Sequence, residues 1–251
     1  MLELKNISLN FNEDSGEAKE VLKNVDLKLE NGKLYGITGP NGGGKTSIAK
    51  VIMGIYQPTE GQIIFKGEDI THLSISERAR KGVAYAFQQP PRFKGILIED
   101  LMRIASPGID NVAIRTYLHD VGLCPEDYIG RDMGPSLSGG ETKRIEVAQL
   151  LAKEALLTIF DEPEAGVDLW TIQRLIAIII KKHRENSDRT AVIITHNEQF
   201  LPICDEIILV SDGSIADKGP SEVIWPTIKD EIACNMKIQC GGGKHGTQQI
   251  R

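Results

Sequence analysis

The amino-terminal part of the chain alternates apolar and polar residues, a pattern typical of β-strands that bury one face. The alternation covers residues 2–11 and again residues 22–29, and a polar segment that contains Gly16 separates the two stretches. A turn at Asn31-Gly32 then leads into a short apolar run over residues 34–38. We therefore expect two half-buried strands, followed by a short strand that is buried on both faces.

Helical patterns and short apolar runs follow one another through the rest of the chain. Residues 45–53 and 169–184 are predicted to be helices, and the segment that starts at Ser74 has the chemistry of a helix start. From residue 90 to residue 135 the patterns are helical and no strong strand pattern occurs. Further short strands are expected over residues 62–65, 83–87, 156–160, 191–195 and 206–210.

This order of elements predicts an α/β fold with an inserted helical part. We expect a core made of residues 1–89 and 156–220, and a helical subdomain over residues 90–155. Residues 221–251 are expected to form a C-terminal extension that is partly flexible, because it ends in a glycine-rich stretch.

Composition narrows the classes of protein that fit. The 251 residues include 41% hydrophobic and 25% charged residues, as in an ordinary globular protein, and no apolar run approaches the roughly 20 residues of a membrane span. The first residues lack a signal-peptide pattern, and four cysteines are too few for a disulfide scaffold, so we expect a cytoplasmic location. The net charge of −6 argues against binding of nucleic acid.

A glycine-rich loop after the apolar run at residues 34–38 predicts phosphate binding. It matches the pattern G-x-x-x-x-G-K-[ST] and lies between a predicted strand and a predicted helix, the context that this pattern requires. Lys45 is expected to reach the β- and γ-phosphates, and the Thr46 hydroxyl is expected to bind Mg²⁺. The predicted nucleotide-binding residues of this loop are Gly39, Pro40, Asn41, Gly42, Gly43, Gly44, Lys45, Thr46 and Ser47.

Two carboxylates follow the apolar run at residues 156–160. Ligands of α/β sheets bind at the carboxyl ends of strands, so Asp161 and Glu162 are placed to take part in chemistry. We expect Asp161 to hold the Mg²⁺ shell and Glu162 to polarise the attacking water.

A pentapeptide, L-S-G-G-E at residues 137–141, makes the pattern more specific. Together with the phosphate loop and the carboxylate pair, it resembles the ATP-binding-cassette (ABC) ATPases over residues 1–220. The resemblance implies a P-loop NTPase core, an antiparallel β-subdomain and a helical subdomain. It also implies ATP and Mg²⁺ as cofactors, ATP hydrolysis as the activity, and a homodimer that forms head to tail when ATP binds.

The same resemblance assigns roles to residues outside the two motifs. Gln88 matches the glutamine that contacts Mg²⁺ and links the core to the helical subdomain, and His196 matches the histidine that senses the γ-phosphate. Phe11 stands where the family keeps an aromatic ring that stacks on adenine. The signature residues that cap the γ-phosphate of the opposite subunit are Ser138, Gly139 and Gly140. Glu162, His196 and Lys45 are the predicted catalytic residues.

The flanks of the motifs suggest which process the ATPase drives. The segment at residues 78–90 and the charged residues after the signature, among them Glu141, Lys143 and Glu146, are similar to the ATPase subunit of the SUF iron–sulfur cluster assembly system. A soluble SUF-like scaffold protein is therefore the expected partner. The alternative is a transmembrane permease, because Pro163 is typical of transporter subunits.

Two further features have weaker implications. Ala165 replaces the serine that transporter ATPases carry in the loop after the carboxylates, so a hydroxyl that could cross the dimer interface is missing. Cys234, Cys240 and His245 near the carboxyl end do not form a metal-binding spacing, and we expect two free thiols there.

Overall fold

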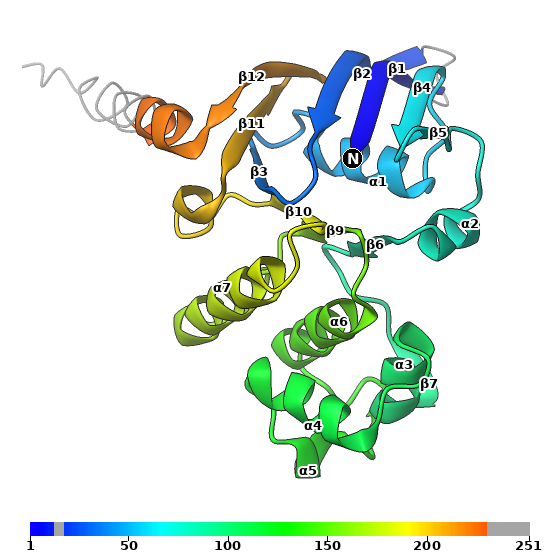
Figure 1. Cartoon of the computed structure of the whole chain (residues 1–251), viewed down its shortest axis with the longest axis vertical. Coiled ribbons are helices and arrows are strands. Elements are labelled where there is room, and N and C mark those ends of the chain that lie inside the picture. The colour runs from blue at the N-terminus through cyan, green and yellow to red at the C-terminus, as the bar shows by residue number, and fades with distance from the viewer. Residues whose placement is uncertain (13–17, 230–251) are drawn as a thin grey trace, which may run out of the picture.

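The alternating amino-terminal segments form a four-stranded antiparallel sheet (Figure 1). The computed structural model describes residues 1–12 and 18–229. In order across the sheet, the strands are β2 (Ala18–Leu29), β1 (Leu2–Asn12), β4 (Glu60–Phe65) and β5 (Glu68–Asp69). Most apolar side chains of this sheet are buried, among them Leu4, Val25 and Ile63, as the alternation predicts.

A six-stranded sheet forms the centre of the molecule. Its strands, in spatial order, are β12 (Ser214–Pro220), β11 (Glu206–Ser211), β3 (Leu34–Thr38), β10 (Thr190–Ile194), β9 (Leu157–Asp161) and β6 (Val83–Ala86). The five strands from β11 to β6 are parallel, and β12 adds an antiparallel edge. Strands β3, β6 and β10 are buried at every position, which explains their continuous apolar sequences.

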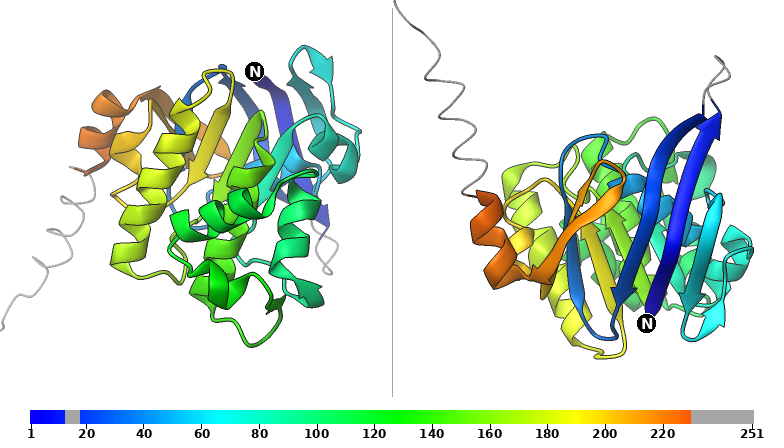
Figure 2. Two further views of the ribbon diagram at one scale, coloured as in Figure 1. Left: turned by 60° about the horizontal axis from the view of Figure 1, so that its bottom comes forward. Right: turned by 90° about the horizontal axis from the view of Figure 1, so that it is seen from above.

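Helices cover both faces of the central sheet (Figure 2). They are α1 (Lys45–Met53), α2 (Ile75–Arg80), α3 (Ile98–Ala105), α4 (Asn111–Asp120), α5 (Pro125–Tyr128), α6 (Gly139–Lys153), α7 (Leu169–Arg184) and the 3₁₀ helix η1 (Leu201–Ile203). Helix α1 packs in one apolar core with the antiparallel sheet, whereas α3, α4, α6 and α7 share a second core on the opposite face.

The helical part contains one strand pair that the sequence pattern does not predict. Strands β7 (Phe93–Leu97) and β8 (Asp132–Met133) form a two-stranded antiparallel ribbon. Residues 93–95 are exposed, so the segment lacks the apolar alternation that marks a half-buried strand. The expectation of no strand between residues 90 and 135 is therefore wrong at this ribbon.

The end of the described chain returns to the core. Strand β12 follows a turn at Asp212-Gly213, and residues 221–229 are helical. Ile224 of this helical segment packs with Leu201 and Ile207 in a small third cluster. Cys234, Cys240 and His245 lie outside the described residues.

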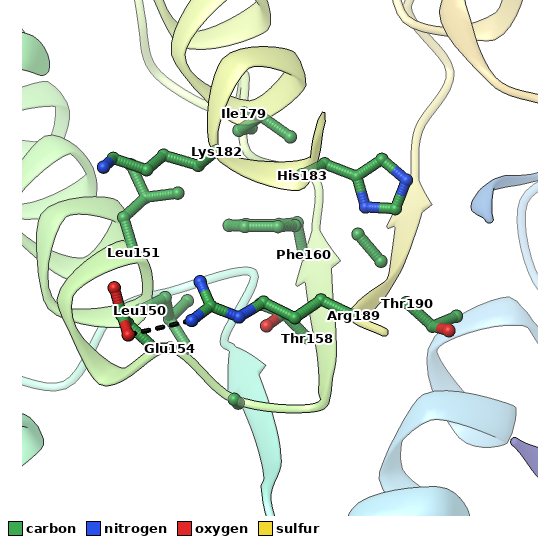
Figure 3. A pocket seen from close by; sticks show the side chains of 12 residues that line it. Leu150, Leu151, Glu154, Thr158, Phe160, Ile179, Lys182, His183, Arg189 and Thr190 are labelled. Atoms are coloured by element: carbon green, nitrogen blue, oxygen red, sulfur yellow. Dashed lines mark hydrogen bonds and ion pairs between the residues drawn. The ribbon is translucent and has the colours of Figure 1, made fainter. Parts of the chain in front are cut away.

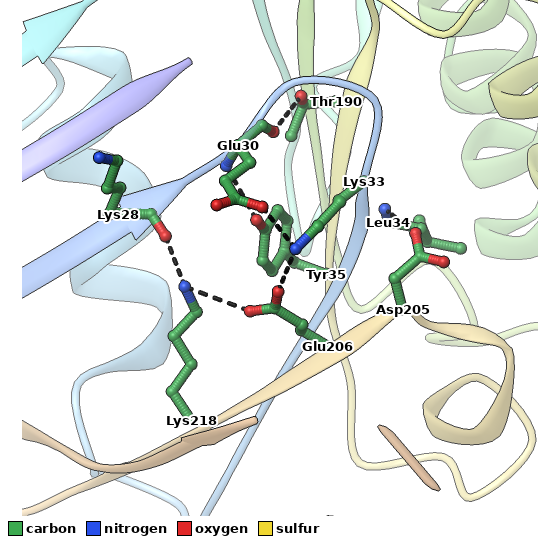
Figure 4. Close-up of polar contacts among 9 residues, drawn as sticks. All are labelled: Lys28, Glu30, Lys33, Leu34, Tyr35, Thr190, Asp205, Glu206 and Lys218. Carbon is green, nitrogen blue, oxygen red and sulfur yellow. Dashed lines mark hydrogen bonds and ion pairs between the residues drawn. The ribbon is translucent and has the colours of Figure 1, made fainter. Parts of the chain in front are cut away.

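A polar network joins the two sheets at the amino ends of the core strands (Figure 4). Lys33 Nζ lies 2.5 Å from both Glu30 Oε2 and Glu206 Oε1, and Lys218 Nζ lies 3.2 Å from Glu206 Oε2. Tyr35 is buried, and its hydroxyl accepts a hydrogen bond of 2.8 Å from the Glu30 backbone N–H. The network holds the amino ends of β3 and β11, which lie opposite the loops at the carboxyl ends of these strands.

Among the described residues, no helix has the length and apolarity needed to cross a bilayer.

Candidate active site

Four neighbouring parallel strands deliver the predicted site residues to one edge of the central sheet. Strand β3 leads into the glycine-rich loop, β10 into the segment with His196, β9 into the carboxylates, and β6 into the segment with Gln88. Because these strands are adjacent and parallel, their carboxyl ends lie at the same edge. The order β3-β10-β9-β6 thus gathers residues that are far apart in sequence.

The loop between β3 and α1 requires glycine at its first position. Gly39 has a φ of +136°, and a Cβ atom there would lie 2.0 Å from the carbonyl oxygen of Val210. The Lys45 ammonium donates to the carbonyl oxygens of Gly39 at 2.9 Å and Pro40 at 2.8 Å. Lys45 is buried, and desolvation lowers the pKa of its ammonium. The loop therefore encloses its lysine at the amino end of α1, where backbone N–H groups favour anions.

A pocket of about 570 Å³ lies in front of this loop. Its walls include residues Asn41, Gly42, Gly44, Lys45, Thr46, Ser47, Gln88, Glu162 and His196, which the sequence singles out. The structure adds residues of β2 and of the β11–β12 turn, namely Lys19, Glu20, Val21, Lys23, Asp212 and Gly213. These residues carry no phosphate-binding motif: those of β2 reach the pocket through the contact between the two sheets, and those of the turn reach it because β11 lies beside β3.

Asp161 is connected to the loop by oxygen atoms suited to a hard cation. The Thr46 hydroxyl donates to Asp161 Oδ1 at 3.3 Å, and the Tyr85 hydroxyl donates to Asp161 Oδ2 at 2.6 Å. Asp161 is completely buried, and desolvation raises the pKa of its carboxyl despite these two hydrogen bonds. A hydroxyl beside a single carboxylate is a donor set that fits Mg²⁺ held partly by phosphates. Tyr85 has no motif of its own and is missed by the sequence.

Glu162 and Gln88 form a direct contact across the pocket. Gln88 Nε2 donates to Glu162 Oε2 at 2.8 Å. Glu162 has a φ of +47°, an unusual backbone conformation for a residue with a side chain, and its N–H donates to the Ile194 carbonyl at 2.9 Å. His196 lines the same pocket, and its pKa is lowered by burial and by the nearby charge of Lys45, while Glu162 acts in the opposite direction.

The L-S-G-G-E segment forms the start of α6. Ser138 is the N-cap residue: its hydroxyl accepts from the Glu141 N–H, and Glu141 accepts in return from the Ser138 N–H. Glu141 also accepts from the Tyr128 hydroxyl, and these bonds, Tyr128 first, lower the pKa of Glu141 to about 2. A Cβ atom on Gly140 would lie 3.0 Å from the carbonyl oxygen of Gly166, so only glycine fits without a shift.

This helix start borders a hollow of its own. The hollow has a volume of about 370 Å³ and is lined by Gln88, Gln89, Pro90, Arg92, Gly139, Thr142, Ala165 and Gly166. Gln88 is common to both linings, whereas Lys45 and the rest of the phosphate loop line only the first pocket. Gly139 of the signature therefore lines a different hollow from the phosphate loop of the same chain.

Comparison with known proteins gives the family. A model of the ABC transporter family matches residues 22–165, more than half of the chain. The chain belongs to the ABC transporter family. An uncharacterized ABC transporter ATP-binding protein of Methanocaldococcus jannaschii is 35% identical to this cassette over 233 residues, which are 89% of this chain and 92% of the relative. A probable ATP-dependent transporter of Cyanophora paradoxa is 31% identical over 240 residues, with coverage of 89% and 90%.

Solved structures confirm the fold class of the cassette. An ATP-binding cassette in a dimeric post-hydrolysis state, bound to ADP and Pi, superposes with a TM-score of 0.79 at 24% identity and covers 88% of this chain and 99% of that chain. A bacterial Atm1-family ABC exporter with ATP bound has the same TM-score at 22% identity and covers 96% and 42%. These likenesses confirm the α/β P-loop core with its antiparallel and helical parts.

Phe11 is a predicted site residue that lines neither the phosphate pocket nor the hollow at the signature. Its ring is partly exposed and meets Tyr56 edge to face, with 5.0 Å between ring centroids, and Lys50 Nζ lies 5.1 Å from the Tyr56 ring. Phe11 is not in the lining of the 570 Å³ pocket. Its stacking on adenine stays a prediction.

A smaller hollow lies away from the phosphate loop, between α6, α7 and the core strands (Figure 3). It has a volume of about 40 Å³ and contains none of the predicted site residues. Arg189 Nη2 pairs with Glu154 Oε2 at 2.8 Å beside it, and the His183 imidazole Nε2 lies 3.1 Å from the carbonyl oxygen of Gly32. These two contacts join neighbouring segments of the chain, and we assign no ligand to this hollow.

Proposed function

We propose that this cassette binds Mg·ATP and hydrolyses it in a head-to-tail dimer, as the ATP-binding subunit of a membrane transporter. One observation carries this proposal: the phosphate loop, Glu162 and His196 line one pocket, whereas Gly139 of the signature borders another. The buried Asp161 is joined to the first pocket by its hydrogen bond with Thr46. The family membership supports ATP as the nucleotide, and the Atm1-family exporter of similar fold has ATP bound.

The residues of the pocket have distinct chemical tasks. The loop N–H groups and Lys45 hold the phosphates, and Thr46 with Asp161 would hold Mg²⁺, which neutralises charge on the phosphate oxygens. Glu162 accepts a proton from, or orients, the attacking water, and Gln88 keeps its carboxylate in place by the 2.8 Å hydrogen bond. His196, with its lowered pKa, is neutral at pH 7 and can donate one hydrogen bond to the γ-phosphate.

Dimerisation would complete each site. Ser138, Gly139 and Gly140 present the amino end of a 15-residue helix, an arrangement that favours phosphate. Within one chain this helix start faces a separate hollow, so it is free to cap the γ-phosphate on a second copy. ATP would then hold the two copies together, and hydrolysis would release them.

An apolar groove next to the site supports docking of a partner. It has a volume of about 350 Å³ and lies between the core and the helical part. Phe87, Phe93 and Ile104 line it and are all exposed. Phe87 directly precedes Gln88, so a segment of a permease bound in this groove would influence the position of Gln88 in the ATP pocket. The cassette would then work at the cytoplasmic face of a membrane through its permease.

A second candidate partner is a soluble SUF-like scaffold for iron–sulfur cluster assembly. Its support is the sequence after the signature, where Glu141, Lys143 and Glu146 follow the SUF pattern. The relatives named above are described as transporter proteins, which favours the permease.

Steady-state hydrolysis of ATP by the purified chain tests the activity. We expect Mg²⁺-dependent release of phosphate, and we expect Lys45→Ala to abolish it, because Lys45 is the only lysine of the phosphate loop, residues 39–47. Lys50→Ala, on the same helix but outside the pocket, is the matched control and should retain activity. Activity that survives Lys45→Ala would contradict the assignment of the loop.

Affinity purification from detergent-solubilised cells tests the partner. The transporter proposal predicts recovery of a multi-span membrane protein that is lost when Phe93 is changed to Asp in the groove. Recovery of a soluble scaffold protein instead would favour the SUF-like alternative.

A further inference from the structure

Two charged side chains of α6, Lys143 and Glu146, are buried next to the carboxyl ends of β6 and β9. Lys143 is 1% exposed and Glu146 is 7% exposed. Lys143 Nζ lies 3.3 Å from Glu146 Oε2, a contact that is ionic rather than a hydrogen bond. Burial of two charges is costly, and replacement by apolar side chains is often neutral or stabilising. Since stability alone does not explain the buried pair, its hydrogen bonds with the backbone indicate what the pair does.

The Lys143 ammonium bridges two neighbouring strand ends. It donates to the carbonyl oxygen of Phe87, at the end of β6, and to that of Asp161, at the end of β9, at 3.1 Å. Strands β6 and β9 pair up to Ala86 and Phe160, so the ammonium lies where their ladder stops. Each of the two carbonyls belongs to the peptide bond that leads into a site residue.

Glu146 binds the backbone N–H of Phe87, the residue whose carbonyl oxygen binds Lys143. Its Oε1 accepts a hydrogen bond of 2.8 Å from the Phe87 N–H. Both backbone groups of Phe87 are thus bound by the pair, and the next residue, Gln88, contacts Glu162. The pair fixes the direction in which the chain leaves β6.

The second carbonyl explains how Glu162 keeps its unusual backbone. The peptide group between Asp161 and Glu162 is bound on both sides: Lys143 donates to its oxygen, and its N–H donates to Ile194 at 2.9 Å. A positive φ such as the +47° of Glu162 persists where the surroundings determine the conformation. Removal of the ammonium leaves this peptide oxygen unbound by α6.

We propose that Lys143, assisted by Glu146, is a positioning residue that holds Glu162 and Gln88 in the geometry for hydrolysis. The proposal rests on the ATPase function proposed above. Because α6 begins at Gly139 of the signature, the Lys143 side chain also joins the signature helix to the two strand ends that carry Gln88 and Glu162. A movement of α6 when a second copy binds at its amino end would therefore change the position of Glu162.

Lys143→Met tests the proposal while it keeps the apolar stem. We expect kcat for ATP to fall about tenfold or more, with the Kd for a fluorescent ATP analogue within about twofold of the wild-type value. Lys153→Met is the matched control: it lies on the same helix, and its ammonium donates to Val83 at the opposite end of β6, at 3.4 Å. We expect its kcat to stay within about twofold of the wild-type value.

A double-mutant cycle separates positioning from a general loss of structure. If Lys143 acts through Glu162, then adding Lys143→Met to Glu162→Gln leaves the single-turnover rate within about twofold of Glu162→Gln alone. Equal rate losses in both backgrounds, or a wild-type kcat for folded Lys143→Met, would overturn the proposal. Wild-type hydrolysis by Glu162→Gln would instead overturn the proposed function.

If Lys143→Met does not fold, Glu146→Gln provides the second variant. It keeps an oxygen acceptor for the Phe87 N–H and removes the charge that orients the ammonium. We expect kcat to fall about threefold or more with unchanged analogue binding. Full activity of this folded variant would also count against the pair.

Discussion

At the scale of single residues, His196 gives the cassette a pH dependence that can be measured. Burial and the charge of Lys45 lower the pKa of His196 below its ordinary value of 6.5, so the imidazole is mostly neutral at pH 7. We expect kcat/KM to be constant around pH 7–8 and to fall as the pH drops through the lowered pKa. His196→Gln should lower kcat about 10²-fold and should remove this acid limb. A profile with an unchanged limb in the variant would show that another group titrates.

Residues that stand in contiguous motifs are the ones that the sequence predicts well. The phosphate loop, Asp161, Glu162 and His196 each follow a strand, and the parallel order of those strands brings them together. Tyr85 and the place of Asp212 and Gly213 in the pocket lining could not be predicted in the same way. They reach the site through strand order and sheet packing, which no local pattern encodes.

At the scale of elements, two helices begin with the same chemistry and allow a controlled comparison. Ser74 caps α2 and Ser138 caps α6, and each forms a capping box with the glutamate three residues later. Ser74→Ala and Ser138→Ala should each lower the free energy of unfolding by about 1 kcal/mol, measured by urea denaturation. Only Ser138→Ala should also lower kcat, because only α6 carries the signature. Equal activity of the two variants would contradict a role of this helix start in the ATP site.

Elements with strong periodicity and clear caps are also predicted best. Helices α1 and α7 occupy the predicted residues, and α7 begins behind the capping side chain of Asp168. Strand β7 is partly exposed and pairs with the short strand β8, which is distant in sequence. The edge strand β12 is also partly exposed, and it pairs with β11 across a tight turn. Such segments depend on pairing rather than on their own alternation.

At the scale of the whole molecule, two unlike hollows occupy one face of the chain. The phosphate pocket and the signature hollow share Gln88, and the signature glycine lines only the second. In the proposed function, the site that combines both takes its signature part from a second copy in opposite orientation. The sequence resemblance predicts this arrangement, and the separation of the hollows gives it a physical basis.

The mass of Glu162→Gln in saturating Mg·ATP, measured by light scattering after size exclusion, tests this central claim most directly. The variant keeps the phosphate loop and the signature but slows hydrolysis, so ATP should hold two copies together at about twice the 27.6 kDa of the chain. Adding Ser138→Arg should return the mass to that of a monomer, because the arginine blocks the signature side of the partner's site. A monomer for Glu162→Gln at saturating Mg·ATP, or a dimer that is insensitive to Ser138→Arg, would contradict the account.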